Sequence, residues 1–246
     1  MDKGKIVYQL LCAALLVAVG FLVWSNKQKS EALESAKTVA TDVDKRQTSY
    51  ILETVTKDSF DLPYPKVVGG MPIQEAFAAR ATNRNFSNQP LSDQQISDLL
   101  WVANGVNRAE SNMRTAPSAR NCQEIDIYVF LRSGIYKYDA LRNYLFLIKG
   151  GDHRREAGKN TFFKDAPVAL VFAADFEKMS EYDQEAKTFY SATDVGFVSE
   201  NVYLYCASNN LSTCVCGFID RESLALRIGL RNGKVLLSQA IGWEKE

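Results

Sequence analysis

Two arginines and a threonine stand within five residues at positions 80–84, which read Arg-Ala-Thr-Asn-Arg. A guanidinium group can bind a phosphate through two parallel charge-assisted hydrogen bonds, and a nearby hydroxyl can bond a remaining oxygen. Arg80, Thr82 and Arg84 are therefore candidates for a phosphate site. A cluster of this kind is more often an ordinary solvated surface, so it does not define a function by itself.

A second candidate segment is the small-residue turn at 117–123, Pro-Ser-Ala-Arg-Asn-Cys-Gln. Small side chains let the backbone come close to a flat ligand, and Ser118, Asn121 and Gln123 supply hydrogen-bonding groups. Proline, serine and asparagine are also common in turns that bind nothing. This segment, like the first, indicates a function only when it is considered together with the other motifs of the chain.

A helix with a defined start separates these two segments. Ser92 stands three residues before Gln95, which is the spacing of a capping box, and Gly105 is a typical helix terminator. Between them, apolar residues repeat on one helical face: Ile96, Leu99, Leu100 and Ala103. A shorter helix, starting at Pro72, leads into Arg80.

The remaining elements predict an α+β sandwich, with a mixed central sheet of four or five strands flanked by helices. Alternation predicts a half-buried strand at 125–132 that turns at Gly134 into a hairpin, and a continuous apolar run predicts a doubly buried strand at 166–174. Valines at helical spacing predict a central helix, buried all round, at 188–210. The other predicted elements are a helix within 141–164, a strand at 214–219, a helix at 220–228 and a strand at 235–243.

Composition excludes several classes of function. The 246 residues carry no net charge, which gives no reason to expect nucleic-acid binding. The five cysteines are scattered and the chain has one histidine, so neither a disulfide framework nor a metal site is indicated. There is no dinucleotide fingerprint, phosphate-binding Walker loop or nucleophile elbow.

The N-terminal quarter differs from the rest of the chain. Residues 6–24 are almost wholly apolar and long enough to cross a bilayer, so we predict a signal anchor at 1–25, with a cleaved signal as the alternative. A polar spacer is expected at 26–60 and a folded domain at 61–246. Lysines flank both ends of the apolar run. A short basic N-terminus favours export of the domain, although a cytoplasmic orientation stays open.

Over residues 62–246 the combination of motifs resembles the FMN-dependent nitroreductase family. That family opens with an Arg-x-Ser/Thr-x-Arg/Lys element and a Pro-Leu-Ser helix start, and it continues with a Pro-Ser-Ser/Ala-x-Asn-x-Gln turn. It closes on a strand ending in Gly-Tyr or Gly-Trp. The matching residues here stand in the same order: 80–84, 90–92, 117–123 and 242–243. The segments LLWVANGVNR and RTAPSARN are most similar to the branch of azoline-oxidising dehydrogenases.

The resemblance implies a nitroreductase-like sandwich that forms a homodimer with FMN at the subunit interface. Arg80, Thr82 and Arg84 would bind the FMN phosphate, with Lys245 as a further candidate. The partner subunit's turn would line the flavin through Pro117, Ser118, Ala119 and Asn121. Backbone amides of Cys216 and Gly217 would lie near the flavin N5. This chain departs from the family at Arg120, which is bulkier than usual, and at Cys214-Val-Cys216.

The function implied is an FMN-dependent oxidoreductase with ping-pong electron transfer from NAD(P)H or another donor to a small organic acceptor. No protein side chain is assigned as catalytic, because the cofactor carries the chemistry. One alternative is a dehydrogenase dedicated to a modified peptide or another single substrate. Another is a non-catalytic flavin-binding or interaction domain.

Overall fold

The structure is a computed structural model that describes residue 27 and residues 59–245. The chain divides into two units, 1–55 and 56–246, and the fold below is that of the second. A search of the described residues for a helix both long and apolar enough to span a bilayer finds no such helix. The predicted anchor at 1–25 lies outside the described residues, as does nearly all of the predicted spacer at 26–60.

A seven-stranded sheet forms the centre of this unit, with the strand order β1-β6-β5-β4-β7-β9-β8. Its strands are β1 (Ser59–Asp61), β4 (Ile125–Phe130), β5 (Gly134–Asp139), β6 (Tyr144–Gly150), β7 (Val168–Asp175), β8 (Ser212–Cys216) and β9 (Gly233–Gly242). A separate two-stranded sheet pairs β2 (Val106–Arg108) with β3 (Met113–Arg114). β8 is an edge strand, so one side of its backbone is open to other partners.

The α+β class with helices flanking a central sheet is confirmed, whereas the details of the sheet differ from the prediction. It has seven strands rather than four or five, and every strand pairing in the described residues is antiparallel rather than mixed. β4, β5 and β6 follow one another through short turns, and short turns can join only antiparallel neighbours. β6 occupies residues predicted to contain a helix, and only the short 3-10 helices η2 (Arg154–Ala157) and η3 (Thr161–Lys164) follow it.

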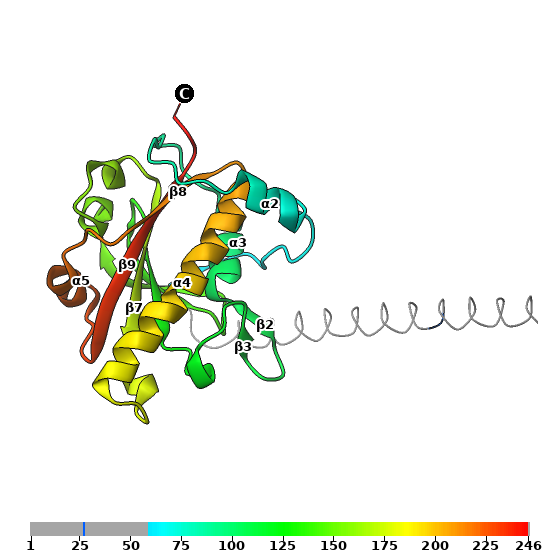
Figure 1. The fold of residues 1–246 in the computed structure, drawn as a ribbon. Helices are drawn as coiled ribbons and strands as arrows, with labels where there is room; N and C mark the ends of the chain where they lie inside the picture. Colours follow the sequence, from blue (N-terminus) through cyan, green and yellow to red (C-terminus); the bar gives the residue numbers. More distant parts are fainter. Residues whose placement is uncertain (1–26, 28–58, 246) are drawn as a thin grey trace, which may run out of the picture. The chain divides into compact units, whose positions relative to one another are not determined.

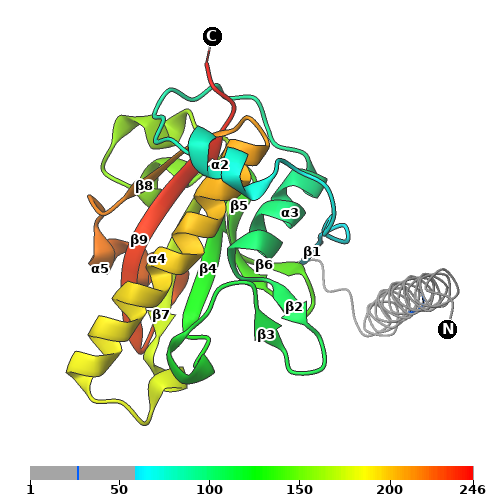
Figure 2. The ribbon, with the colours of Figure 1, turned by 45° about the vertical axis from the view of Figure 1, so that its right-hand side comes forward.

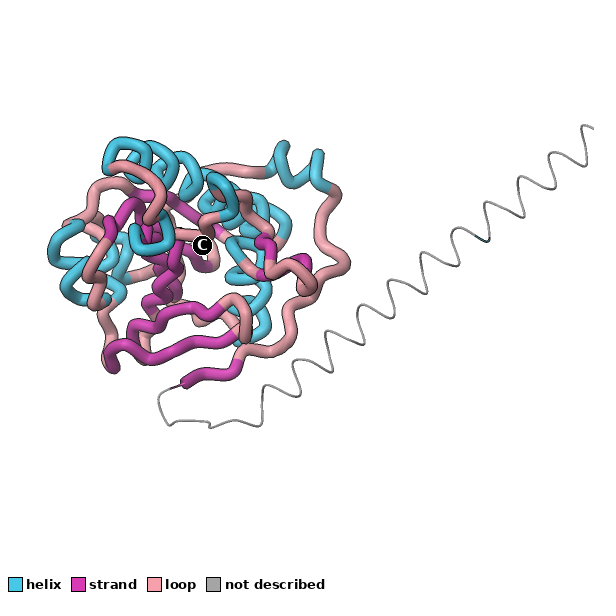
Figure 3. The backbone as a smooth tube through the Cα atoms, turned by 90° about the horizontal axis from the view of Figure 1, so that it is seen from below, coloured by secondary structure: helices cyan, strands magenta, loops and turns pink. Residues whose placement is uncertain are grey.

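Helices cover both faces of the sheet (Figure 1, Figure 3). The long helix α4 (Gln184–Ser208) crosses one face together with α3 (Asp93–Asn104), and α2 (Ile73–Ala79) packs on α4, whereas α5 (Arg221–Ile228) lies on the other face. Two further 3-10 helices connect these elements, η1 (Ala119–Asn121) and η4 (Phe176–Met179). The capping box of α3 forms as predicted, because the side chains of Ser92 and Gln95 each bond the other's backbone.

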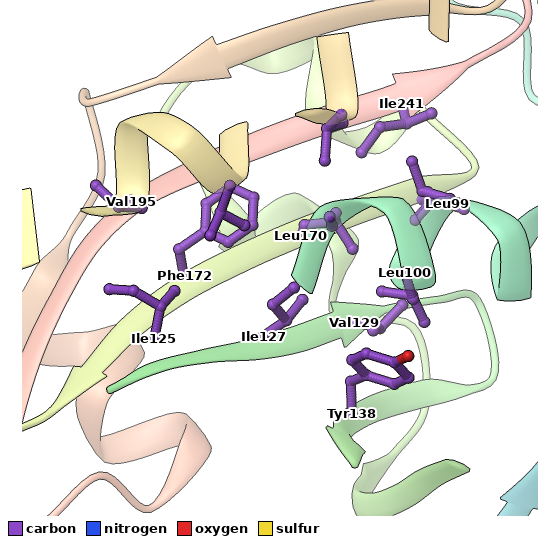
Figure 4. Packing of buried hydrophobic residues seen from close by; sticks show 14 of the residues in the cluster. Leu99, Leu100, Ile125, Ile127, Val129, Tyr138, Leu170, Phe172, Val195 and Ile241 are labelled. Carbon is purple, nitrogen blue, oxygen red and sulfur yellow. The ribbon is translucent and has the colours of Figure 1, made fainter. Parts of the chain in front are cut away.

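β7 shows why the predicted apolar strand at 166–174 had to be buried on both faces. Its alternate residues Leu170 and Phe172 enter the core beneath α3 and α4, whereas Val171 enters the core on the α5 side. Figure 4 shows Leu170 and Phe172 packed with residues of β4, α3 and α4. This core fixes the position of α4, on which the candidate site depends.

The prediction that the central helix is buried all round is wrong for this unit. Only one side of α4 packs on the sheet, through Val195, Val198 and Val202. The other side leaves Phe189 64% and Phe197 46% exposed. The valine spacing correctly located the helix, but spacing cannot show that a sheet covers only one of its faces.

Candidate functional site

The predicted phosphate-binding residues lie together against the C-terminal part of α4 and the open edge of β8. The extended segment 80–84 joins β8 where the amide of Asn83 donates to the carbonyl of Thr213 at 3.0 Å. The Thr82 hydroxyl lies 2.9 Å from the Tyr203 hydroxyl, and the Arg80 guanidinium lies over the Tyr203 ring at 5.4 Å. Sequence positions more than 100 residues apart are thus brought to one place.

Tyr203 is the residue that fixes this arrangement, and sequence reasoning missed it. Its hydroxyl accepts a hydrogen bond from the Val215 amide at 3.0 Å, an open-edge amide of β8. The hydroxyl can then donate its own hydrogen to Thr82, so one buried tyrosine links α4, β8 and the segment 80–84. The sequence did contain a signal for it, because Tyr203 directly follows a valine of the predicted buried helix. The hydroxyl of a buried tyrosine usually has a hydrogen-bond partner.

Arg84 and Lys245 complete the basic cluster. The C-terminal residues run antiparallel to the segment after α2, with a bridge between Phe86 and Glu244 (Figure 1). The Lys245 amide donates to the carbonyl of Asn85 at 3.2 Å, and the Asn85 side chain donates back to the Lys245 carbonyl at 2.8 Å. The side chains of Arg80, Arg84 and Lys245 are all exposed, so three cations are available to an anion from solvent.

Cys216 and Gly217 lie at the C-terminal end of β8, whereas the basic cluster lies beside the N-terminal half of this strand. The Cys216 thiol is buried and directed to Asn160 and Phe218, at 3.7 Å from an oxygen of each. Gly217 is exposed, and a side chain at this position would meet only Leu237, at 3.7 Å. The backbone at Gly217 can therefore be approached from solvent. Burial raises the pKa of the nearby Cys214 thiol, and the positive charge of Arg84 opposes that effect.

The turn at 117–123 is held in an unusual backbone shape. Arg120, Asn121 and Gln123 have positive φ angles of 49°, 57° and 51°, a region that non-glycine residues rarely occupy. Ser118 closes the turn, because its hydroxyl accepts from the Gln123 amide at 2.9 Å and its carbonyl accepts from the Asn121 amide at 3.0 Å. Such strain persists only where the surroundings enforce it.

A buried aspartate in the middle of α4 provides part of that enforcement. Asp194 is 4% exposed, and its carboxylate accepts a hydrogen bond from the Ala119 amide at 2.8 Å. The Gln123 side chain adds a second clamp, since it accepts from Arg114 at 2.9 Å and donates to Asn121 at 3.1 Å. Asp194 was also missed. In the sequence it is a single acid among apolar helical positions, a pattern that fits a buried acid with a partner as well as an acid on a solvated face.

Within one chain, the structure keeps the two predicted halves of the site apart. The basic cluster is tied to α4 at Tyr203 and the turn is tied to it at Asp194, nine residues earlier. At 1.5 Å per residue this separates the two anchor points by about 14 Å along the helix axis. Figure 2 shows the two attachment regions at different levels of α4. Pro117, Ser118, Ala119 and Asn121 therefore do not meet Arg80, Thr82 and Arg84 directly.

Comparison with known protein families and proteins finds nitroreductases over most of this unit. The model of the nitroreductase family matches residues 77–243, a range that includes the segment 80–84, the turn and β8. A provisionally named nitroreductase of Methanocaldococcus jannaschii is 29% identical over 176 residues, which cover 67% of this chain and 88% of the relative.

Solved structures show the same similarity. A provisionally named nitroreductase of Ralstonia eutropha JMP134 is 38% identical with a TM-score of 0.74, over 78% of this chain and 93% of that one. An NADPH:FMN oxidoreductase of Vibrio harveyi, solved with NAD+, is 19% identical with a TM-score of 0.52, over 71% and 69% of the two chains. The second likeness is one of fold alone.

Proposed function

The chain belongs to the nitroreductase family, and from this premise we propose that it is an FMN-dependent oxidoreductase. The observation that carries the proposal is the basic cluster: Arg80, Thr82, Arg84 and Lys245 gather beside the N-terminal part of β8, although they come from opposite ends of the domain. The solvent-accessible backbone of Gly217 follows the other, C-terminal end of the same short strand.

The residues present fit the two chemically different parts of FMN. The exposed guanidinium groups of Arg80 and Arg84, with the Lys245 ammonium, match a phosphate dianion by charge and by donor geometry. Thr82 adds a hydroxyl whose orientation is fixed by Tyr203. These groups can bind and orient the phosphate end, while exposed amides at the end of β8 can donate to a ring nitrogen.

The small residues of the turn suit the flat ring. Pro117, Ser118 and Ala119 carry little bulk, and the enforced backbone shape at Asn121 presents a rigid surface. Since this turn lies away from the basic cluster of its own chain, we place it against the flavin of a second copy. When bound, FMN would supply ping-pong electron transfer, taking electrons from NAD(P)H or another donor and passing them to a small organic acceptor.

A homodimer is supported by the exposed apolar side of α4. Phe189 and Phe197 lie eight residues apart on this helix, with Thr193 and Gly196 between them, so their exposed rings share one face. An exposed apolar face of this kind marks an interaction surface. Sedimentation of the purified protein should give a dimer, and Phe189→Asp with Phe197→Asp should give a monomer.

The visible spectrum of the purified full chain tests the proposal. A flavin spectrum, or uptake of added FMN by protein that lacks it, is the expected result. Failure to bind FMN would overturn both the oxidoreductase and the dedicated dehydrogenase and leave an interaction domain. Anaerobic bleaching by NADH or NADPH would then identify the general reductase, and its absence would identify a dedicated dehydrogenase.

We also propose, from residues outside the described part of the chain, that 1–25 anchors the protein in a membrane with the domain exported. The apolar run at 6–24 supports this proposal. A reporter fused after Glu246 would distinguish the two orientations, and recovery of the intact chain in the soluble fraction would contradict the anchor.

A further inference from the structure

A second buried acid lies beside the one that holds the turn. Glu124 immediately follows the turn and is 0% exposed. Its backbone carbonyl accepts from the Asp175 amide at 2.9 Å, but no described residue donates a hydrogen bond to either oxygen of its side chain. A buried carboxylate without a donor is strongly disfavoured, so the absence of donors itself indicates that Glu124 carries a proton.

The group that can accept this proton is Asp194. The two carboxyl groups come within hydrogen-bonding reach, and a hydrogen bond between two carboxyl groups requires that one of them be protonated. Asp194 already acts as an acceptor, because one of its oxygens accepts from the Ala119 amide at 2.8 Å. Glu124 is therefore the donor and Asp194 the acceptor.

The charged surroundings of Glu124 do not change this assignment. Lys178, from η4, opposes the protonation, but its ammonium donates to the Gln123 carbonyl at 3.2 Å and to Asp126 at 2.8 Å. The Asp175 carboxylate accepts from the amide of Glu177. Cys122 faces the same acids, and burial raises the pKa of its thiol, so the thiol is neutral at pH 7. Burial and the neighbouring Asp194 raise the pKa of Glu124 from the ordinary 4.5 to about 7.

We propose that Glu124 and Asp194 share one proton and act together as positioning residues, holding the turn at 117–123 in the shape that receives the flavin ring. The chain of contacts runs from Glu124 to Asp194 and from Asp194 to the Ala119 amide. The inference rests on the proposed function only in taking the flavin ring as the ligand of the turn. The shared proton stands on the burial and the contacts of the two acids.

Loss of the proton should loosen the turn. Two adjacent buried carboxylates repel each other, and either Asp194 or Glu124 must then move toward water. Asp194 cannot move without releasing Ala119, and the left-handed backbone at Arg120 and Asn121 would lose one of the contacts that enforce it. FMN binding should accordingly weaken as pH rises through about 7.

The test follows the Ala119 amide and FMN affinity in the same samples of full chain. With alanine labelled by ¹⁵N, the Ala119 resonance without flavin should shift with an inflection near neutral pH. The dissociation constant for FMN should rise about tenfold between pH 6 and 9, which corresponds to a pKa difference of about one unit between free and bound protein.

Glu124→Gln is the matched variant, because its amide keeps the size and the donor to Asp194 but cannot ionise. It should abolish both pH dependences while retaining the affinity that the unaltered chain shows at pH 6. An Ala119 resonance without an inflection, or a Gln variant that titrates like the unaltered chain, would overturn the shared proton.

Two further readouts keep the test decisive. If Glu124→Gln does not fold, ¹³C-labelled glutamate reports the Glu124 carboxyl directly: titration near neutrality supports the pair, and titration near the ordinary value overturns it. If the chain binds no FMN at any pH, the proposed function fails, while the Ala119 inflection still decides whether the proton is shared.

Discussion

The basic cluster and the turn are built in different ways, and the proposed FMN site gives them different tasks. The cluster presents exposed charged side chains from an ordinary extended backbone, which is held by hydrogen bonds to the edge of β8. The turn presents its backbone, which three left-handed residues distort and which the buried Asp194 holds through the Ala119 amide. A phosphate is recognised by charge and can be met by flexible side chains, whereas a flat ring requires a rigid surface. The difference in construction matches the two parts of the proposed ligand, the phosphate and the ring of FMN.

The largest expected effect comes from removing the charges of the basic cluster. Arg80→Ala with Arg84→Ala should weaken FMN binding by 100-fold or more, since each charge-assisted hydrogen bond contributes about 1.5–3 kcal/mol. The control is Arg142→Ala with Arg231→Ala, which removes two exposed arginines from turns elsewhere. Fluorescence titration with FMN measures both, and equal losses would show that net charge, not position, is what matters.

The second effect concerns the buried acids of the turn. Because the folded pKa of Glu124 is raised to about 7 from 4.5, the folded chain binds more protons than the unfolded chain between these values. The free energy of unfolding should therefore fall as pH rises from about 4.5 to 7 and then level off, by up to a few kcal/mol at about 1.4 kcal/mol per pKa unit. Urea unfolding at several pH values measures this. Glu124→Gln should remove that component, and an unchanged slope would contradict it.

A smaller effect is expected at Arg120, where two substitutions distinguish the contribution of the backbone conformation from that of the side chain. Arg120→Val and Arg120→Gly both delete the ion pair with Glu181, but only valine conflicts with a φ of 49°. Valine should lower the free energy of unfolding by about 1–2 kcal/mol relative to glycine. Thermal unfolding compares the two variants, and equal stabilities would mean that the turn is not strained at this position.

The smallest effect is expected for the Tyr203 hydroxyl. Tyr203→Phe keeps the ring beneath Arg80 but removes the link between Thr82 and Val215, which should weaken FMN binding about fivefold, as for a single hydrogen bond of about 1 kcal/mol. Tyr205→Phe is the matched control, because it deletes a hydroxyl from the same helix that bonds Gln95 instead. If Tyr205→Phe weakened FMN binding more than Tyr203→Phe, the loss would come from a general change in the helix and not from the Tyr203 hydroxyl.

The same contrast explains how much could be predicted from the sequence. Charge is visible in residue types, so Arg80, Thr82 and Arg84 were located correctly as one group, as was the capped helix after them. Strand and helix periodicity placed β4, β7 and α4. Tyr203, Asp194 and Glu124 were missed because their roles depend on neighbours that lie far away along the chain. The sheet was underestimated because β6 alternates weakly and β1 is only three residues long.

Mixing two defective variants tests the central claim that the cluster of one copy and the turn of another form one FMN site. Arg80→Ala with Arg84→Ala breaks only the cluster, and Ala119→Trp blocks only the turn. After unfolding and refolding together in equal amounts, bound FMN measured by absorbance should return to about one quarter of the value for the unaltered chain, because half of the dimers are mixed and each has one intact site. No recovery, with mixed dimers demonstrated, would contradict the account and place both halves in a single chain.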